Sequence, residues 1–325
     1  MAVKSTLDRI FVLELVRVTE AAAIAAAKLV GMGDEKAADA AAVDSMRNEL
    51  NELAIRGRIV IGEGERDEAP MLYIGEEVGT GTGPEIDIAL DPLEGTTIAA
   101  KAMQNSLAVV ALAEKGNLLN APDVYMDKIA VGPGFPMGIV DLDNSVEDNI
   151  KAVADAKGRQ VSDMLVCVLD RPRHMDLIDK VRATGARVKL IGDGDVAGVI
   201  DTTDPDTSVD IYMGSGGAPE GVLAAAALRC IGGQIQGRLT FRNDTERGRA
   251  RKWGIEDLDR KYSTEEMAAG DVIFAATGVT DGTLLRGVHS TVDGKGYTTD
   301  TVVMRSASKT VRHINTIHNR ENKID

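Results

Sequence analysis

The chain has 325 residues, of which 37 are Lys or Arg and 51 are Asp or Glu, so its formal net charge at pH 7 is −14. This length suits two domains or one large domain, and the content of 44% hydrophobic and 27% charged residues excludes general disorder. The acidic balance argues against a nucleic-acid partner, because phosphate backbones attract clustered Lys and Arg. It still permits a phosphorylated small substrate if metal ions supply the positive charge.

Cysteines and apolar runs narrow the class of protein further. Cys167 and Cys230 both lie in apolar stretches, so we expect two buried thiols; their number excludes a disulfide scaffold or a Cys-rich zinc site. No apolar run approaches the ~18 residues of a membrane span. Charges at Asp8, Arg9 and Glu14 interrupt the N-terminal apolar residues, which argues against a secretory signal. We therefore expect a cytoplasmic protein without membrane contact.

The first half of the chain predicts alternating helices and strands. Apolar and Ala residues at helical spacing predict a helix over residues 6–30, which Gly31 and Gly33 end. Asp34 is typical of an N-cap and predicts a second helix over residues 35–53. Short apolar runs predict strands at 58–61, 86–90 and 106–113. This alternation indicates an α/β fold.

The second half predicts a run of βα units and hence a parallel sheet. The predicted strands are 164–169, 187–191 and 209–213, and the predicted helices are 149–157, 175–184, 196–200 and 219–229. Two further strands are predicted in the tail, at 271–276 and 301–305. We place the domain boundary near residue 160, which gives an N-terminal domain over 1–160 and a C-terminal domain over 161–325.

Acidic residues gather where a predicted strand ends. The strand over 86–90 runs into Asp91, Pro92 forces a turn, and Glu94 and Thr96 follow before a predicted helix. Hard divalent cations prefer carboxylate and hydroxyl oxygens of this kind. The alternative is a capped turn in which Asp91 and Thr96 satisfy backbone amides.

Three more segments follow predicted strands and carry acids or glycines. Residues 62–68 (GEGERDE) form either a metal loop or a solvated acidic loop. Residues 192–195 (GDGD) form either a functional turn or an ordinary βα turn. Residues 214–221 (GSGGAPEG) could form an anion-binding nest before a helix, where Glu220 could simply complement the helix dipole. Because P-loop, HExxH and GxSxG patterns are absent from the sequence, metal-assisted hydrolysis of a phosphate ester is the favoured chemistry.

Several longer blocks resemble a known family. They are residues 38–40 (ADA), 61–65 (IGEGE), 68–75 (EAPMLYIG), 91–96 (DPLEGT), 119–126 (LNAPDVYM), 171–174 (RPRH), 193–195 (DGD) and 216–221 (GGAPEG). With these blocks the chain resembles the class II fructose-1,6-bisphosphatases, including related cyanobacterial enzymes that also act on sedoheptulose 1,7-bisphosphate, over nearly its whole length. The strand-end motif alone would suggest only the wider superfamily of lithium-sensitive phosphatases.

The resemblance implies a sugar-phosphatase-like sandwich of alternating helix and sheet layers, with two or more Mn²⁺ or Mg²⁺ ions. By position, Asp39 and Glu63 resemble the ligands of one metal, whereas Asp91, Glu94 and Glu220 resemble those of the other. Local pattern alone marks Asp39 as an ordinary surface residue of a helix. The positions that resemble substrate-binding residues are Glu94, Gly95, Thr96, Tyr125, Arg171, Pro172, Arg173, Asp193, Gly194, Asp195 and Gly217.

The implied activity is hydrolysis of the 1-phosphate of fructose 1,6-bisphosphate to fructose 6-phosphate and phosphate, in carbohydrate metabolism such as gluconeogenesis. Thr96 resembles the hydroxyl that assists a metal-bound water, and Asp91 and Glu94 complete the expected catalytic set. A homo-oligomer, dimeric or tetrameric, is expected. Three alternatives stay open: dual action on sedoheptulose 1,7-bisphosphate, a preference for inositol phosphates, and a non-catalytic regulator that binds sugar phosphates.

Overall fold

The computed structural model describes residues 6–64 and 71–319 of the chain. The chain divides into two compact units: unit 1 comprises residues 1–116 and 270–325, and unit 2 comprises residues 117–269. This division differs from the predicted linear boundary near residue 160, which falls inside unit 2. The reason is that residues 272–278, near the end of the chain, pair with residues 107–113 in one sheet, so the first and last segments share a core.

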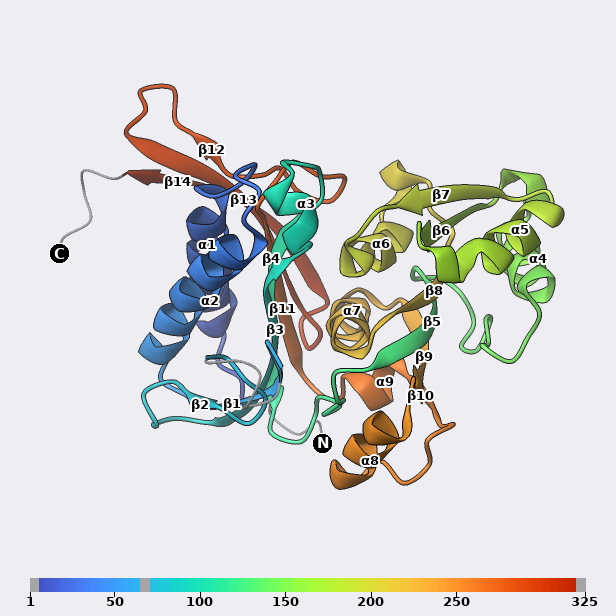
Figure 1. Cartoon of the computed structure of the whole chain (residues 1–325), viewed down its shortest axis with the longest axis horizontal. Coiled ribbons are helices and arrows are strands. Elements are labelled where there is room, and N and C mark those ends of the chain that lie inside the picture. Colours follow the sequence, from blue (N-terminus) through green and yellow to red (C-terminus); the bar gives the residue numbers. More distant parts are fainter. Residues whose placement is uncertain (1–5, 65–70, 320–325) are drawn as a thin grey trace. The chain divides into compact units, whose positions relative to one another are not determined.

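Unit 1 is built on a mixed sheet with helices on one face (Figure 1). Its elements are α1 (Phe11–Ala27), α2 (Glu35–Glu52), β1 (Arg56–Ile61), β2 (Glu77–Val78), β3 (Glu85–Glu94), α3 (Thr96–Ala100), β4 (Leu107–Glu114), β11 (Val272–Gly278), β12 (His289–Ser290), β13 (Gly296–Arg305) and β14 (Thr310–Asn319). The strand order is β12-β13-β11-β4-β3-β1-β2, and β14 also pairs with β13. Among the described strands of this sheet, only β1 and β3 run parallel.

The two long helices of unit 1 confirm the predicted pattern. Helix α2 begins where predicted, and the Asp34 side chain accepts a hydrogen bond from Ala37 N at 3.0 Å. Its apolar stripe is fully buried; the stripe consists of Ala38, Ala42, Met46 and Leu50. Helix α1 begins at Phe11 rather than at residue 6. Both helices pack their apolar faces on the sheet, and this burial forms the core of unit 1.

Unit 2 is a second layered arrangement of helices and strands. Its elements are β5 (Tyr125–Val131), α4 (Val146–Lys157), η1 (Val161–Asp163), β6 (Leu165–Leu169), η2 (Pro172–His174), α5 (Met175–Ala183), β7 (Arg187–Ile191), α6 (Asp195–Ile200), η3 (Asp201–Thr203), η4 (Pro205–Thr207), β8 (Ile211–Gly217), α7 (Ala218–Ile231), β9 (Gln234–Thr240), α8 (Asp244–Lys252), β10 (Lys261–Ser263) and α9 (Thr264–Met267). The strand order is β10-β9-β5-β8-β6-β7.

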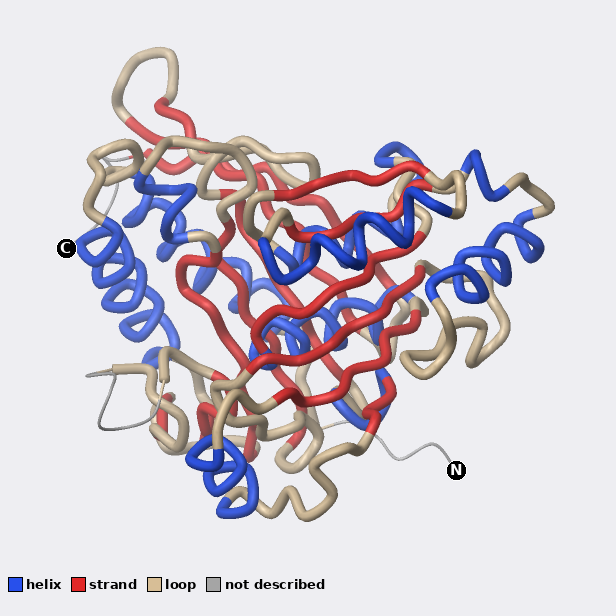
Figure 2. The backbone as a smooth tube through the Cα atoms, turned by 45° about the vertical axis from the view of Figure 1, so that its right-hand side comes forward, coloured by secondary structure: helices blue, strands red, loops and turns tan. Residues whose placement is uncertain are grey.

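This second sheet is mixed, which corrects the prediction of a parallel sheet. Strands β7, β6 and β8 are parallel, as the βα units predicted. Strand β5 comes from an earlier part of the chain and lies between β8 and β9, antiparallel to both. Figure 2 shows these strands side by side. Helices α4 and α5 pack on one face through an apolar cluster that includes Ile129, Val166 and Ile211.

Helices α6 and α7 contact the strands of the same sheet, and α7 packs beside Met126 and Lys128 of β5. Since side chains alternate along a strand, Lys128 points away from the face that carries Ile129. Unit 2 therefore has helices on both faces of its sheet. Together the two units confirm the predicted layered α/β fold.

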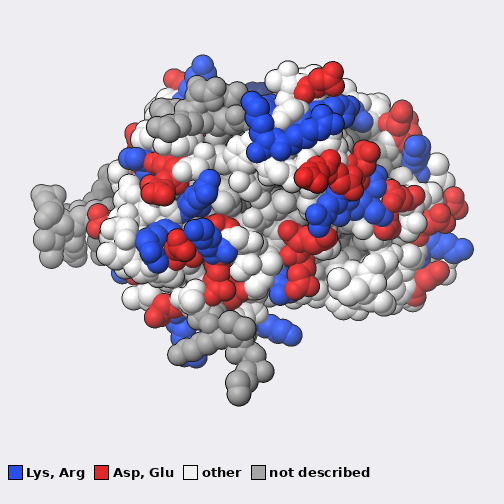
Figure 3. All heavy atoms as spheres, turned by 90° about the horizontal axis from the view of Figure 1, so that it is seen from below, with Lys and Arg blue, Asp and Glu red and all other residues white. Residues whose placement is uncertain are grey.

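The prediction of two buried thiols is confirmed. Cys167 and Cys230 are both buried. Among the described helices, none is long and apolar enough to cross a membrane. On the face of the molecule in Figure 3, Lys and Arg side chains lie among Asp and Glu side chains.

Candidate active site

Two neighbouring parallel strands of unit 1 each lead into a carboxylate. In the register of β1 and β3, Ile61 lies beside Ala89. Glu63 and Asp91 each follow two residues later, so both carboxylates lie at the same edge of the sheet. This is the edge at which α/β proteins place ligands, beyond the carboxyl ends of parallel strands.

Asp39 joins this edge from helix α2. Burial raises the pKa of Glu63 to about 8, and the nearby Asp39 carboxylate raises it as well. Burial also raises the pKa of Asp39 itself. Two carboxylates that are partly withdrawn from water and repel each other favour a cation between them. The structure therefore brings Asp39 and Glu63 together, although Asp39 looked like an ordinary surface residue in the sequence.

The end of β3 differs from its prediction. The strand continues through Asp91 and Pro92 to Glu94, with an irregular register between Asp91 and Glu94 against β4. Leu93 N donates a hydrogen bond to Asp91 Oδ1 at 3.1 Å, so one oxygen does cap a local turn, as the alternative reading required. Glu94 is 4% exposed. The carboxylates are thus presented by the strand itself rather than by a loop after it.

A left-handed glycine then turns the chain toward Thr96. Gly95 has φ 80° and ψ 50°, a conformation that favours glycine, and Thr96 is the first residue of α3. Ser106 Oγ donates to Glu94 O at 2.9 Å and holds this turn against the sheet. Asp91, Glu94 and Thr96 are therefore fixed on one short, braced segment.

The predicted metal ligands fit a hard divalent cation by chemistry. They are all carboxylates, and Glu220 Oε2 is buried without a hydrogen-bond partner among the described residues. Within the described part of the chain, no group of three or more His, Cys, Asp or Glu is arranged as a metal centre. Glu220 belongs to unit 2, and residues 65–68 of the predicted acidic loop and 68–70 of the next block lie outside the described residues.

The glycine-rich segment of unit 2 corrects another prediction. Gly214 and Gly217 do not form a nest in a loop, because residues 214–217 belong to β8 and pair with β5. The absence of a side chain at these glycines leaves space for neighbouring groups. A Cβ on Gly217 would overlap the Glu220 carboxylate, which lies in the first turn of α7. The glycines therefore make room for buried charge.

That buried charge includes a lysine which sequence reasoning missed. Lys128 of β5 is 2% exposed; its ammonium group donates to Asp195 Oδ2 and, at 2.8 Å, to Gly217 O. Burial and the Asp195 carboxylate raise the pKa of Glu220 to about 7, while Lys128 acts in the opposite direction. We call Lys128, Asp195, Gly217 and Glu220 the Lys128 network. The available sequence signal was a lysine at an inward-facing position of a strand.

Tyr125 and Arg173, two predicted substrate residues, lie together in unit 2. The Arg173 guanidinium carbon is 4.9 Å from the centre of the Tyr125 ring. Arg173 Nε and Nη2 donate to Ser215 O at 3.0 and 2.7 Å, which fixes the plane of the guanidinium. Next to it, His174 Nε2 accepts a hydrogen bond from Ser215 N at 2.8 Å, which is a structural contact.

Arg171 and Asp193 also meet. Leu169 of β6 lies beside Ile191 of β7, and each of the two charged residues follows two positions later. Their side chains form an ion pair at 3.6 Å. Pro172 begins η2, and Gly194, with φ 82°, is the N-cap of α6, which begins at Asp195. At this edge, as in unit 1, two neighbouring parallel strands each lead into a charged side chain.

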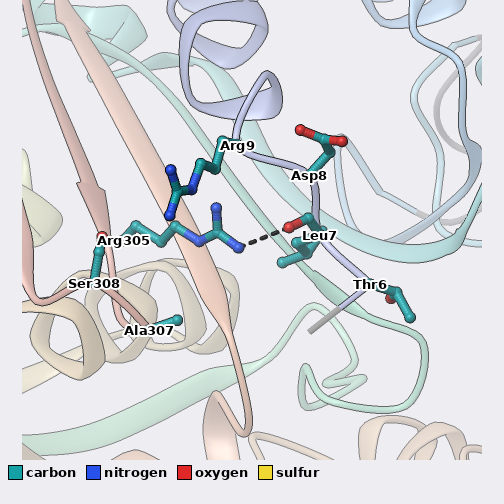
Figure 4. A pocket seen from close by; sticks show the side chains of 7 residues that line it. All are labelled: Thr6, Leu7, Asp8, Arg9, Arg305, Ala307 and Ser308. Carbon is teal, nitrogen blue, oxygen red and sulfur yellow. Dashed lines mark hydrogen bonds between the residues drawn. The ribbon is translucent and has the colours of Figure 1, made fainter. Parts of the chain in front are cut away.

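A separate pocket in unit 1 has no predicted site residue in its lining (Figure 4). Its volume is about 470 Å³, and it is lined by Thr6, Leu7, Asp8, Arg9, Arg305, Ala307 and Ser308. Arg305 is paired with Asp271 at 2.7 Å and donates to Leu7 O at 2.7 Å. The Arg305 charge is therefore already paired with the Asp271 carboxylate.

Layered α/β units with carboxylates at neighbouring strand ends are the arrangement expected of a phosphatase. The model of the family described as "Bacterial fructose-1,6-bisphosphatase, glpX-encoded" matches residues 9–318. The chain belongs to this family, which confirms the resemblance found in the sequence.

Relatives of the chain carry a matching name. The proteins called D-fructose 1,6-bisphosphatase class 2/sedoheptulose 1,7-bisphosphatase of Synechococcus sp. strains JA-3-3Ab and JA-2-3B'a(2-13) are 49% and 48% identical to it over 334 residues. These alignments cover 95% of this chain and 95% of each relative. The protein of that name from Trichodesmium erythraeum (strain IMS101) is 45% identical over 337 residues, with 96% of this chain and 97% of the relative covered.

Proposed function

We propose that the protein hydrolyses the 1-phosphate of fructose 1,6-bisphosphate to give fructose 6-phosphate and inorganic phosphate. The observation that carries this proposal is the family match over residues 9–318, supported by relatives of that name at 45–49% identity. The carboxylates at the strand ends of unit 1 supply chemistry suited to the reaction. A non-catalytic regulator would have no use for this acidic set.

We propose Asp39 and Glu63 as ligands of one divalent cation, Mg²⁺ or Mn²⁺, and Asp91, Glu94 and Glu220 as ligands of another. The raised pKa values of Asp39, Glu63 and Glu220 support this assignment, because each of these carboxylates is costly to ionise without a positive partner. When bound, the cations would polarise the scissile phosphate and offset the charge of a doubly phosphorylated sugar.

The remaining residues of unit 1 would orient the reactants. The Thr96 hydroxyl would hold the attacking water. Its place on the braced turn after Gly95 fixes its position relative to Glu94. Such fixed geometry lowers the barrier because the reacting groups need not be ordered during the reaction. Glu94, Gly95 and Thr96 would also contact the phosphate-bearing end of the substrate.

Unit 2 would contribute groups that bind the sugar and its distal phosphate. Arg173, whose guanidinium lies over the Tyr125 ring, offers donors to a phosphate, for which the planar guanidinium is well suited. Asp193 and Asp195 are suited to accept hydrogen bonds from sugar hydroxyls. We assign Arg171, Pro172, Gly194 and Gly217 to the same binding surface.

The names of the relatives favour a second substrate, sedoheptulose 1,7-bisphosphate. Purified protein is to be tested with Mn²⁺ or Mg²⁺ on fructose 1,6-bisphosphate, sedoheptulose 1,7-bisphosphate and an inositol phosphate, with both phosphate and sugar product measured. We expect fructose 6-phosphate and phosphate in equal amounts from the first substrate. Binding of fructose 1,6-bisphosphate without release of phosphate would support a regulator instead.

A further inference from the structure

We propose that Lys128 is a positioning residue for sugar-phosphate binding, because its ammonium group holds the Asp195 carboxylate and the Gly217 carbonyl in their binding orientation. This inference rests on the proposed function, which assigns Asp195 and Gly217 to the substrate. Lys128 itself was assigned no role by the sequence motifs or by the resemblance.

The contacts of Lys128 join three elements. It extends from β5 and donates to Asp195 at the start of α6 and to the Gly217 carbonyl at the end of β8. The side chains of Lys128 and Asp195 are only 1% and 8% exposed, so water does not compete strongly for this ion pair. A buried ion pair of this kind has a defined geometry, because separating the two buried charges would cost free energy.

The surrounding backbone is shaped to admit the lysine. A Cβ on Gly216 would overlap Asp195 Oδ2 and would lie 3.1 Å from Lys128 Nζ. On the facing helix α7, a Cβ on Gly221 would overlap Met126 Sδ at 2.5 Å and would make an ordinary contact with Lys128 Cδ at 3.5 Å. The absent side chain of Gly216 on β8 therefore leaves space for the ion pair of Lys128 and Asp195.

A role in stability alone explains this arrangement less well. Apolar residues can often replace a buried ion pair without loss of stability, because desolvation of the charges offsets their attraction. Lys128 also lies near two carboxylates, Asp195 and Glu220, that repel each other. Removing the ammonium group would leave Asp195 without its charged partner and would free it to rotate away.

The chain offers a matched control in the same unit. Lys189 of β7 forms an ion pair with Asp201 at 2.6 Å, and Asp201 is similarly buried. Neither residue belongs to the proposed site. The Lys189 side chain is more exposed than that of Lys128, 25% against 1%, and replacing it by Met removes a second lysine–aspartate pair without touching the groups assigned to the substrate.

The test compares Lys128→Met, Asp195→Asn, the double variant and Lys189→Met. For each, kcat and KM for fructose 1,6-bisphosphate are measured, and the binding of fructose 6-phosphate is measured by calorimetry. We expect Lys128→Met to raise KM and weaken product binding by about 10-fold or more, with a smaller change in kcat. Lys189→Met should leave both constants as in the unmodified protein.

The double variant separates positioning from a general effect on the fold. If Lys128 acts through Asp195, the KM of the double variant should match that of Asp195→Asn alone, since the two changes are coupled. The double variant lacks both charges of the Lys128–Asp195 ion pair, so it decides the question if Lys128→Met does not fold.

Two results would overturn the inference while leaving the proposed function in place. One is an unchanged KM and unchanged product affinity in folded Lys128→Met. The other is a fold-increase in KM in the double variant that equals the product of the fold-increases in the two single variants. If the unmodified protein releases no phosphate, the proposed function fails and this inference fails with it.

Discussion

At the scale of single residues, the missing side chain of Gly217 matters as much as the charges around it. Gly217 has φ −61° and ψ 144°, a conformation open to any residue, so it is not needed for the backbone. What excludes a larger residue is the Glu220 carboxylate, which occupies the space of a Cβ. Gly217 therefore controls where a proposed metal ligand lies.

We predict that Gly217→Ala lowers kcat/KM by about 100-fold, because a displacement of the order of 1 Å in a reacting group has effects of this size. The thermal midpoint should change little, since the displaced group is the far end of a flexible side chain. Steady-state kinetics and thermal unfolding of the same preparation check both parts of the prediction.

Gly248→Ala serves as the control for this prediction. Gly248 lies in α8, and a Cβ there meets no atom within 4 Å. The substitution should leave activity unchanged and stabilise the helix by about 0.5–1 kcal/mol. Full activity in Gly217→Ala would show that the position of Glu220 does not matter to the reaction.

Residues differ in how well the sequence predicts their roles. Asp91 and Glu94 were found because they follow an apolar strand directly, a local pattern. Asp39 and Lys128 were not found by pattern, since each sits on an ordinary helix or strand. Their significance arises only when packing brings them to Glu63 and Asp195, residues far away in the sequence.

At the scale of elements, α9 shows how a short helix is held by its cap. Ser263 N and Ser263 Oγ both donate to Glu266 Oε2 at 2.8 Å, and Arg260 Nη2 donates to Glu266 Oε1 at 2.7 Å. These hydrogen bonds lower the pKa of Glu266 to about 2. The ionised carboxylate therefore stabilises the folded state at neutral pH.

We predict that Glu266→Gln lowers the stability at pH 7 by about 1 kcal/mol, the usual effect of a weakened cap. Since the pKa is lowered on folding, this contribution is complete above about pH 4.5 and is lost as the pH falls toward 2. The difference in thermal midpoint between variant and unmodified protein should therefore shrink between pH 7 and pH 3.

Glu265→Gln is the matched control, because Glu265 is the exposed neighbour of Glu266 and pairs only at the surface with Arg229. It should shift the midpoint little at either pH. An equal shift for Glu266→Gln at pH 7 and pH 3 would contradict the role assigned to its ionised form.

Elements also differ in how far the sequence predicts them. Strand β6 was predicted because a continuous apolar run is typical of a buried parallel strand. The end of β8 was taken for a loop, because glycine weakens a strand and usually marks a turn. Gly216 and Gly217 lie in the strand nevertheless, since buried charges fill the space their side chains would need.

At the scale of the whole molecule, the division into units follows strand pairing that no local pattern reveals. Residues 272–278 join β4 in the interior of the sheet of unit 1, more than 150 residues after it. The predicted run of βα units had suggested a single domain boundary near residue 160. Pairing between such distant segments is decided by the complementarity of whole sheet edges.

Divalent cations should stabilise this strongly acidic molecule as a whole. With Mn²⁺ at 100 times its dissociation constant, a site present only in the folded state adds about 2.7 kcal/mol to the free energy of unfolding. We predict a rise in thermal midpoint with Mn²⁺ that Asp91→Asn reduces. An equal rise in the variant would mean that the cation binds elsewhere.

The most direct test of the central claim is phosphate release from fructose 1,6-bisphosphate by the unmodified protein and by Asp91→Asn, with Mn²⁺ and with excess chelator. We predict rapid release by the unmodified protein, loss of release on chelation with recovery when Mn²⁺ is restored, and at least a 100-fold lower rate in Asp91→Asn, about the loss expected from removing one catalytic electrostatic contact. Release that continues in the chelator, or an Asp91→Asn variant with normal activity, would contradict the claim that these strand-end carboxylates hold the catalytic cations.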